Sequence, residues 1–234
     1  MIKLTLHGCS AIAAAAATLL CAGPVLADNV PSNTVRLGMY AVFYHSSADD
    51  LSGPYVPPGL NIKTQDVQTV YLAYLRRLSE FFDLELAFGL PPNTKTLGRG
   101  PAMLGSVPYN GQVISSARWL APSALIDYKL FDDTHALRPY VGVGVNYTSF
   151  YDRQSTAAGD AVAGGPTRIS LRPSVGPVGT FGLKYQPKGP WSLVASYSFS
   201  RVTTRLTADT AGEIRTTHVN FGPQALVVAL GYTF

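Results

Sequence analysis

Three of the four histidines are the side chains of this sequence with the clearest capacity for chemistry. They are His45, His135 and His218, and the first of them is followed by Ser46, Ser47, Asp49 and Asp50. A histidine beside a serine and a carboxylate is the arrangement of an acyl hydrolase or acyltransferase, and two histidines can instead bind a metal ion. Histidine and serine are also ordinary surface residues, and no catalytic motif accompanies them. We therefore expect no enzyme activity and no catalytic, cofactor or metal site.

Thiol chemistry is excluded by the position of the two cysteines. Cys9 and Cys21 lie in an N-terminal segment with a positive start at Lys3 and an apolar, alanine-rich run over 11–22. The small residue Ala27 provides a cleavage site before Asp28, so residues 1–27 are expected to be a signal peptide that is removed. The segment 28–234 then has no cysteine and forms no disulfide or thiolate metal site.

The charge balance argues against nucleic acid as a partner. Without Lys3, 17 Lys and Arg face 14 Asp and Glu, which gives a net charge of +3. The basic residues are scattered and form no run with interleaved aromatic residues. After Ala27 no stretch of 18 apolar residues occurs, so the sequence does not predict a helical membrane protein.

The elements that must position these residues are strands. Tyr, Phe, Val and Thr are frequent, and turn residues recur between short apolar stretches. We predict strands at about 34–45, 66–76, 82–90, 117–130, 138–150, 173–186, 190–206 and 217–234. The connections 46–65, 91–116 and 151–172 are long, 207–216 is intermediate, and 77–81, 131–137 and 187–189 are short. This alternation is typical of an eight-stranded antiparallel transmembrane β-barrel with both termini in the periplasm.

Alternating side chains indicate which face of the barrel meets lipid. In the last predicted strand every second residue is bulky and apolar, and the residues between them are small. The bulky residues, which share one face, are Leu226, Val228, Leu230, Tyr232 and Phe234. Four further strands show the same division. A soluble barrel would turn its bulky face inward and leave glycine and serine outside, so we favour the outer membrane. Aromatic girdles are expected to contain Tyr40, Tyr74, Tyr128, Tyr140, Tyr185 and Tyr232.

The opposite parity defines the candidate lumen. An eight-stranded barrel is just wide enough for its own side chains, which argues against diffusion of sugars. The expected lumen-lining residues are Ala87, Gly142, Gly144, Lys184, Val194, Ser198, Ala225, Val227 and Ala229. Four inward charges, Arg36, Glu85, Asp127 and Lys184, are expected to pair as a polar plug toward the periplasmic end. Small apolar residues above such a plug indicate a slender passage for a hydrophobic solute, with possible lateral exit into the membrane.

Two prolines inside predicted strands bear on that exit. Pro177 and Pro223 cannot donate a hydrogen bond to the ladder. Each marks either a simple bulge near the rim, which is the preferred interpretation, or a place where the barrel wall opens.

Four segments resemble a known family. The residues from Arg138 to Asp152, RPYVGVGVNYTSFYD, resemble the strongest internal motif of the OmpW family of outer-membrane proteins. Leu120 to Leu125, Ser174 to Gly179 and Gly231 to Phe234 are similar to that family in the same order. The chain departs from the family pattern at 118–120, where Arg-Trp-Leu stands in place of histidines.

The resemblance implies an eight-stranded outer-membrane barrel with a narrow apolar lumen that takes part in the uptake of small hydrophobic molecules. The related AlkL-like branch is associated with the uptake of alkanes. The expected partners are outer-membrane lipids, lipopolysaccharide, hydrophobic solutes and the barrel assembly machinery, which would read the C-terminal strand ending in Phe234. The alternative is a structural or adhesin-type barrel with a filled core, acting through the segments 46–65, 91–116 and 151–172.

Overall fold

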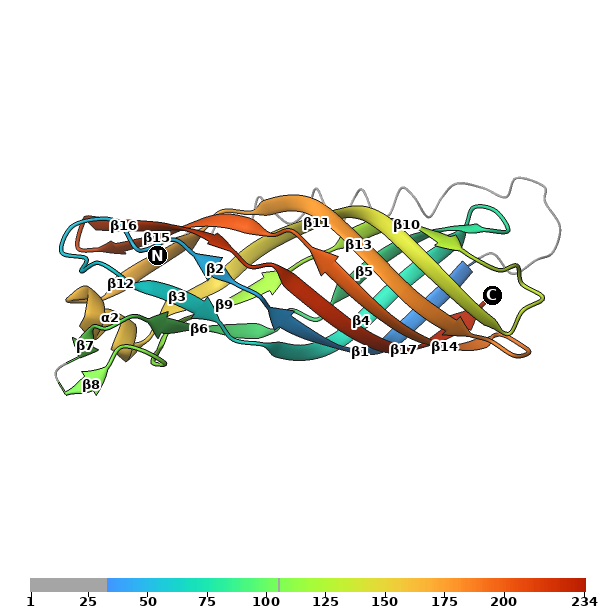
Figure 1. The fold of residues 1–234 in the computed structure, drawn as a ribbon, viewed down its shortest axis with the longest axis horizontal. Coiled ribbons are helices and arrows are strands. Elements are labelled where there is room, and N and C mark those ends of the chain that lie inside the picture. Colours follow the sequence, from blue (N-terminus) through green and yellow to red (C-terminus); the bar gives the residue numbers. More distant parts are fainter. Residues whose placement is uncertain (1–32, 105) are drawn as a thin grey trace, which may run out of the picture. The chain divides into compact units, whose positions relative to one another are not determined.

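The computed structural model describes residues 33–104 and 106–234, and within them eight antiparallel strands close into a barrel (Figure 1). The barrel strands are β1 (Asn33–Tyr44), β4 (Val67–Arg77), β5 (Phe82–Gly89), β10 (Ser123–Lys129), β11 (Leu137–Ser155), β13 (Ser174–Tyr185), β14 (Trp191–Ser200) and β17 (Pro223–Thr233). Closure runs through the pairing of β1 with β17 and of β10 with β11. The all-β, eight-stranded fold class is confirmed. The expected signal peptide, 1–27, lies outside the described residues and remains an expectation.

The outer surface of the barrel is apolar, as the alternation predicts. Val143 and Val175 have 71% and 72% of their surface exposed, whereas the inward residues Val194 and Ala229 have 1% and 2%. In the last strand Leu226, Val228, Leu230, Tyr232 and Phe234 are all exposed. Such a surface is favourable only where an apolar medium covers it.

The aromatic girdle prediction is wrong for two of its six residues. Tyr128, Tyr185 and Tyr232 are exposed on the outer surface, and Tyr74 is partly exposed. Tyr140, however, is 4% exposed, and the Arg36 guanidinium lies over its ring at 5.4 Å. Tyr40 lines a cavity inside the barrel. Both lie on the inward face of their strands. Tyr40 shares the parity of Arg36 and Tyr140 that of Gly142, and the sequence argument had placed Arg36 and Gly142 inside the barrel.

We call the end of the barrel with the longer connections the loop end and the other the turn end. At the loop end, the segments expected to be loops contain further strands and one helix. They are β2 (Ser47–Ala48), β3 (Asn61–Thr64), β6 (Asn93–Arg99), β7 (Met103–Leu104), β8 (Val107–Pro108), β9 (Val113–Leu120) and β12 (Thr167–Leu171), with the helix α2 (Ala157–Ala163). Among the described residues no helix is long and apolar enough to cross a membrane.

The predicted strands 117–130, 190–206 and 217–234 each correspond to two shorter strands. β9 ends at Leu120 and β10 begins at Ser123, with Pro122 between them. The segments β15 (Thr203–Thr210) and β16 (Glu213–Asn220) form a hairpin where an intermediate connection was expected. Ala211 and Gly212 have φ values of 54° and 95°, which is the backbone of a two-residue hairpin turn.

Two larger sheets and a two-stranded sheet of β7 and β8 lie at the loop end. In the first, β3 pairs with β6, β6 pairs with β9, and β9 pairs with residues 149–155 of β11. In the second, β12, β15, β16 and β2 pair in that order as a separate four-stranded sheet. Figure 1 shows β12, β15 and β16 at the end of the barrel opposite the C terminus.

Candidate solute-binding cavity

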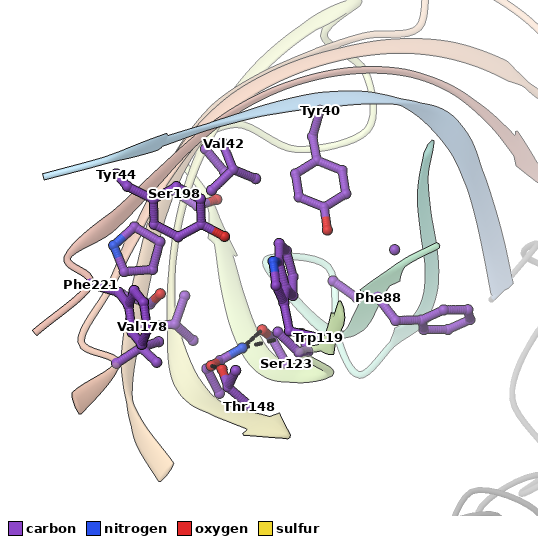
Figure 2. A pocket seen from close by; sticks show the side chains of 18 of the residues that line it. Tyr40, Val42, Tyr44, Phe88, Trp119, Ser123, Thr148, Val178, Ser198 and Phe221 are labelled. Atoms are coloured by element: carbon purple, nitrogen blue, oxygen red, sulfur yellow. Dashed lines mark hydrogen bonds between the residues drawn. The ribbon is translucent and has the colours of Figure 1, made fainter. Parts of the chain in front are cut away.

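An apolar cavity of about 150 Å³ lies inside the barrel, and its lining includes residues of β6 and β9 at the loop end. Figure 2 shows side chains that line it. Its walls include the aromatic residues Tyr40, Tyr44, Trp119, Phe150 and Phe221. An apolar space of roughly this size can hold a benzene-sized molecule. The cavity therefore suits a small hydrophobic ligand better than a sugar.

Several polar groups in the cavity wall already have partners. The Trp119 indole N–H donates to Thr94 Oγ1 at 2.9 Å, and Asn146 Nδ2 donates to Ser123 Oγ at 2.9 Å. Thr148 Oγ1 donates to Asn146 Oδ1 at 2.7 Å. Because these donors are satisfied within the wall, they compete little for a ligand, and the remaining surface offers mainly apolar contact.

The ring of Tyr40 occupies the cavity because Gly89 leaves room for it. A Cβ atom at Gly89 would lie 2.4 Å from the Tyr40 ring. Tyr40 meets Tyr71 edge to face, with ring centroids 6.2 Å apart. The small residues Ala225 and Val227 of β17 complete this side of the wall.

A buried ionic network forms the floor of the cavity. Arg36 Nη1 donates to Glu85 Oε2 at 2.7 Å, and the Tyr71 hydroxyl donates to Glu85 Oε1 at 2.7 Å. Arg36, Glu85 and Asp127 are 2%, 5% and 1% exposed. Glu85 itself lines the cavity. Charge thus replaces apolar surface at the point where an axial path would continue.

The structure places the four candidate plug residues at different points. Arg36 and Glu85 are joined directly. Asp127 is buried near them without a hydrogen-bond partner among the described residues, and its Oδ1 lies 2.1 Å from where a Cβ of Gly142 would be. Lys184 is half-buried nearer the turn end, opposite Arg138 in the ladder. The described residues give it no ion pair.

The candidate lumen residues also divide into groups. The cavity is lined by Ala87, Ser198, Ala225 and Val227, whereas Val194 and Ala229 are buried beyond it. Gly142 packs against Asp127. Gly144 lies against the backbone of Ala124, where a Cβ would approach the carbonyl oxygen to 1.9 Å. These two glycines and Lys184 are not part of the cavity wall, and a functional role for the whole set stays a prediction.

Sequence reasoning missed the aromatic wall. Trp119, Phe150 and Phe221 belong to the predicted strands 117–130, 138–150 and 217–234, but the alternation of faces was not followed as far as these residues. The signal was present in β9. There Ala117 and Trp119, one small and one apolar, lie on the same face of the strand, and Arg118 lies on the opposite face.

A second cavity, of about 470 Å³, lies at the loop end between the two sheets. Leu51, Leu60, Ile114 and Ala208 are among its mainly apolar lining residues. A buried cluster of Ile62, Leu171, Leu206 and Val219 separates it from the barrel cavity. Ile62 and Leu206 border the second cavity, and Leu171 borders the first. We call this cluster the constriction, and Thr96 beside it lines both cavities.

The barrel wall is interrupted beside the first cavity. β5 pairs with β10 as far as Ala87 and Ser123, and pairing of β6 with β9 begins at Asn93 and Arg118. Between the described segments 88–92 and 119–122 no backbone hydrogen bond is formed. Pro91, Pro92 and Pro122 lie in these segments and lack an N–H donor.

This interruption, which we call the lateral break, reaches from the cavity to the outer surface. Phe88 and Ala121, one from each edge, both line the cavity. Phe88 is also 44% exposed. Neither a bulge nor an opening occurs at the prolines singled out from the sequence. Pro177 pairs with Val145 in an unshifted register, and Pro223 begins β17 opposite Tyr44.

Among the described residues, no hydrogen bond or ion pair joins His45 to His218. His218 lies opposite Asp49 in the ladder, whereas His45 is four residues before Asp49 and contacts Gly222 through its backbone. The nearest polar partner of the His218 ring is Arg205, at 3.5 Å. In the described residues no cluster of three or more potential metal ligands is found.

A closed eight-stranded barrel with an apolar outer band defines an outer-membrane barrel protein. Residues 102–234 match the model of the OmpW family, and the chain belongs to this family. Among its relatives, outer membrane protein W of Vibrio cholerae is 26% identical over 232 residues, covering 99% of this chain and 100% of that protein. The dibenzothiophene metabolism operon protein PahQ of Pseudomonas aeruginosa is 30% identical over 136 residues, 56% of this chain and 58% of PahQ.

Solved structures show the same fold. The outer membrane protein OprG of Pseudomonas aeruginosa superposes with a TM-score of 0.78 at 20% identity, covering 88% of this chain and 96% of OprG. The outer membrane protein AlkL gives a TM-score of 0.63 at 18% identity, covering 91% and 95%. The family resemblance seen in the sequence is confirmed, and the family consists of outer-membrane barrels.

Proposed function

We propose that this protein assists the passage of small hydrophobic molecules across the polar outer layer of the outer membrane. The observation that carries the proposal is the apolar cavity bordered by the lateral break. A solute in that cavity contacts aromatic and aliphatic side chains, and Phe88 is the side chain between it and the lipid-facing surface.

The proposed path begins at the loop end. A solute enters the second cavity, passes the constriction and reaches the barrel cavity. It then leaves sideways through the lateral break, because the ion pair of Arg36 and Glu85 closes the axial direction. An apolar molecule that crossed this floor would lose contact with apolar surface and displace a satisfied charge pair.

The proposal includes the orientation and the solute class. The loop end faces outward and both termini face the periplasm, since long connections are extracellular in barrels of this kind. The name of PahQ associates that relative with dibenzothiophene metabolism, and dibenzothiophene is a flat apolar aromatic molecule. The aromatic cavity wall supports a solute of the same class for this protein.

Filling the cavity tests the proposal. Ala225→Phe places a ring in the cavity wall, and Ala195→Phe places the same ring on the exposed outer face of β14. Uptake of a fluorescent apolar aromatic compound would be measured in cells that contain either variant, the unchanged protein or none. We expect Ala225→Phe to reduce uptake to the level without the protein and Ala195→Phe to leave it unchanged.

Equal uptake with and without the unchanged protein would contradict the proposal. It would favour the alternative in which the barrel is structural or adhesive and acts through its loop end.

A further inference from the structure

A group of basic side chains gathers on the outer surface of the four-stranded sheet at the loop end. Arg205 in β15 lies directly opposite His218 in β16. The register of β12 with β15 pairs Leu171 with Leu206, and its continuation by one residue places Arg172 opposite Arg205. Arg172, Arg205 and His218 are all exposed. They thus form one cross-strand row on the outside of the wall.

Two more arginines extend this row. Arg153 of β11 is exposed and donates from Nη1 to the Leu171 carbonyl oxygen at 3.3 Å, next to Arg172. Arg201, also exposed, lies nearer the lipid-facing band and donates its backbone N–H to the Pro177 oxygen at 3.1 Å. We call Arg153, Arg172, Arg201 and Arg205 the arginine cluster.

The arginine cluster has no acidic counterpart in the described structure. None of its four members forms an ion pair there. The neighbouring Asp152 is instead paired with Arg118 at 3.4 Å. Like charges opposite each other destabilise a sheet. The arrangement of Arg172 and Arg205 is therefore unfavourable for folding alone and favourable for binding an anion between them.

The lipid-facing band begins directly beside this cluster. Val175, which is 72% exposed, lies three residues after Arg172. Phe199, which is 54% exposed, lies two residues before Arg201. A molecule bound to both surfaces must carry an anionic head and apolar chains. Guanidinium groups bind phosphate through paired N–H donors, so phosphate is the favoured anion.

We infer that the arginine cluster is a binding site for the phosphorylated head of an outer-leaflet glycolipid of the lipid A class. The phosphate lies between Arg172 and Arg205, and the acyl chains follow Val175 and Phe199 along the barrel. The inference rests on the outward orientation of the loop end in the proposed function, but it does not require that the barrel transports a solute.

Binding of diphosphoryl lipid A to the full barrel, refolded in zwitterionic detergent, tests the inference. Arg172→Gln combined with Arg205→Gln removes the paired guanidinium groups. Arg168→Gln is the matched control, because Arg168 lies on the same exposed face but opposite Asp209. We expect the double variant to lose affinity about tenfold or more and the control to bind like the unchanged protein. Dephosphorylated lipid A should bind the unchanged protein as weakly as diphosphoryl lipid A binds the double variant.

Two further measurements separate a binding defect from a folding defect. Without lipid A, the double variant should unfold at the same temperature as the unchanged protein or a higher one, since a like-charge contact is relieved. Affinity of the unchanged protein should fall as salt is raised, because salt screens exposed charges. Equal binding by the double variant, or equal binding of both lipids, would overturn the inference. Ala225→Phe should bind lipid A normally, so failure of transport and failure of this site are distinguishable.

Discussion

The carboxylate of Glu85 accepts a hydrogen bond from Arg36 on one oxygen and from Tyr71 on the other, each at 2.7 Å. Both carboxylate oxygens are thereby occupied at the floor of the cavity. This single side chain connects the ionic network below with the apolar space above, and it determines where an axial path ends.

The two partners of Glu85 should contribute unequally to stability. Arg36→Met leaves Glu85 and Asp127 buried without their nearby cation, and breaking a buried ion pair costs about 3–5 kcal/mol. Tyr71→Phe removes one hydrogen bond to a charged group, worth about 1.5–3 kcal/mol. Urea unfolding of the refolded barrel in lipid vesicles would measure both free energies of unfolding. A larger loss for Tyr71→Phe than for Arg36→Met would contradict the assigned roles.

Shortening one side chain of the constriction should affect transport and stability together. Leu206 is 8% exposed and separates the two cavities. Leu206→Ala should lower the free energy of unfolding by about 2–5 kcal/mol and increase the uptake rate of an apolar aromatic compound. Leu193→Ala, at an exposed outer position of β14, is the control and should leave uptake unchanged. Reduced uptake in a folded Leu206→Ala variant would show that the cluster does not limit passage.

The turn between β10 and β11 gives a prediction for acidic pH. Hydrogen bonds from the Thr134 hydroxyl, the His135 ring and the Thr134 backbone N–H lower the pKa of Asp132 to about 2. These bonds favour the charged carboxylate, so they support the folded turn above pH ~4, the ordinary pKa of aspartate, and are lost as the pH falls toward 2.

Removal of the Thr134 hydroxyl tests this cause. Thr134→Ala should raise the pKa of Asp132 toward its ordinary value, and Thr134→Ser should leave it low. A carboxyl-carbon NMR titration of both variants would give the values. An unchanged pKa in Thr134→Ala would show that the hydroxyl is not the main cause.

The alternating faces made the barrel predictable from sequence. Val143 and Phe199 belong to strands in which one face is mainly bulky and the other mainly small, and both lie on the outer surface as expected. The loop end was less predictable. There Thr and Arg alternate with single apolar residues, as at Thr204, Arg205 and Leu206, and this pattern resembles a polar loop as much as a strand.

The candidate site was predictable only in part. Ala87 and Ala225 were assigned to the lumen from strand parity, and both line the cavity. The lateral break could not be located in this way, because it depends on which strands pair beyond Ala87 and Ser123. Pro122 was visible in the sequence, but the chain alone does not show that it lies across the wall from Pro91 and Pro92.

Closing the lateral break tests the central claim most directly. Phe88→Cys combined with Ala121→Cys places one thiol on each edge, and a short bifunctional thiol reagent joins them. Ala195→Cys with Val228→Cys, opposite each other in the continuous ladder of β14 and β17, is the matched control. We predict that cross-linking abolishes uptake of an apolar aromatic compound in the first variant and leaves it unchanged in the second. Undiminished uptake after complete cross-linking of the first variant would contradict lateral exit.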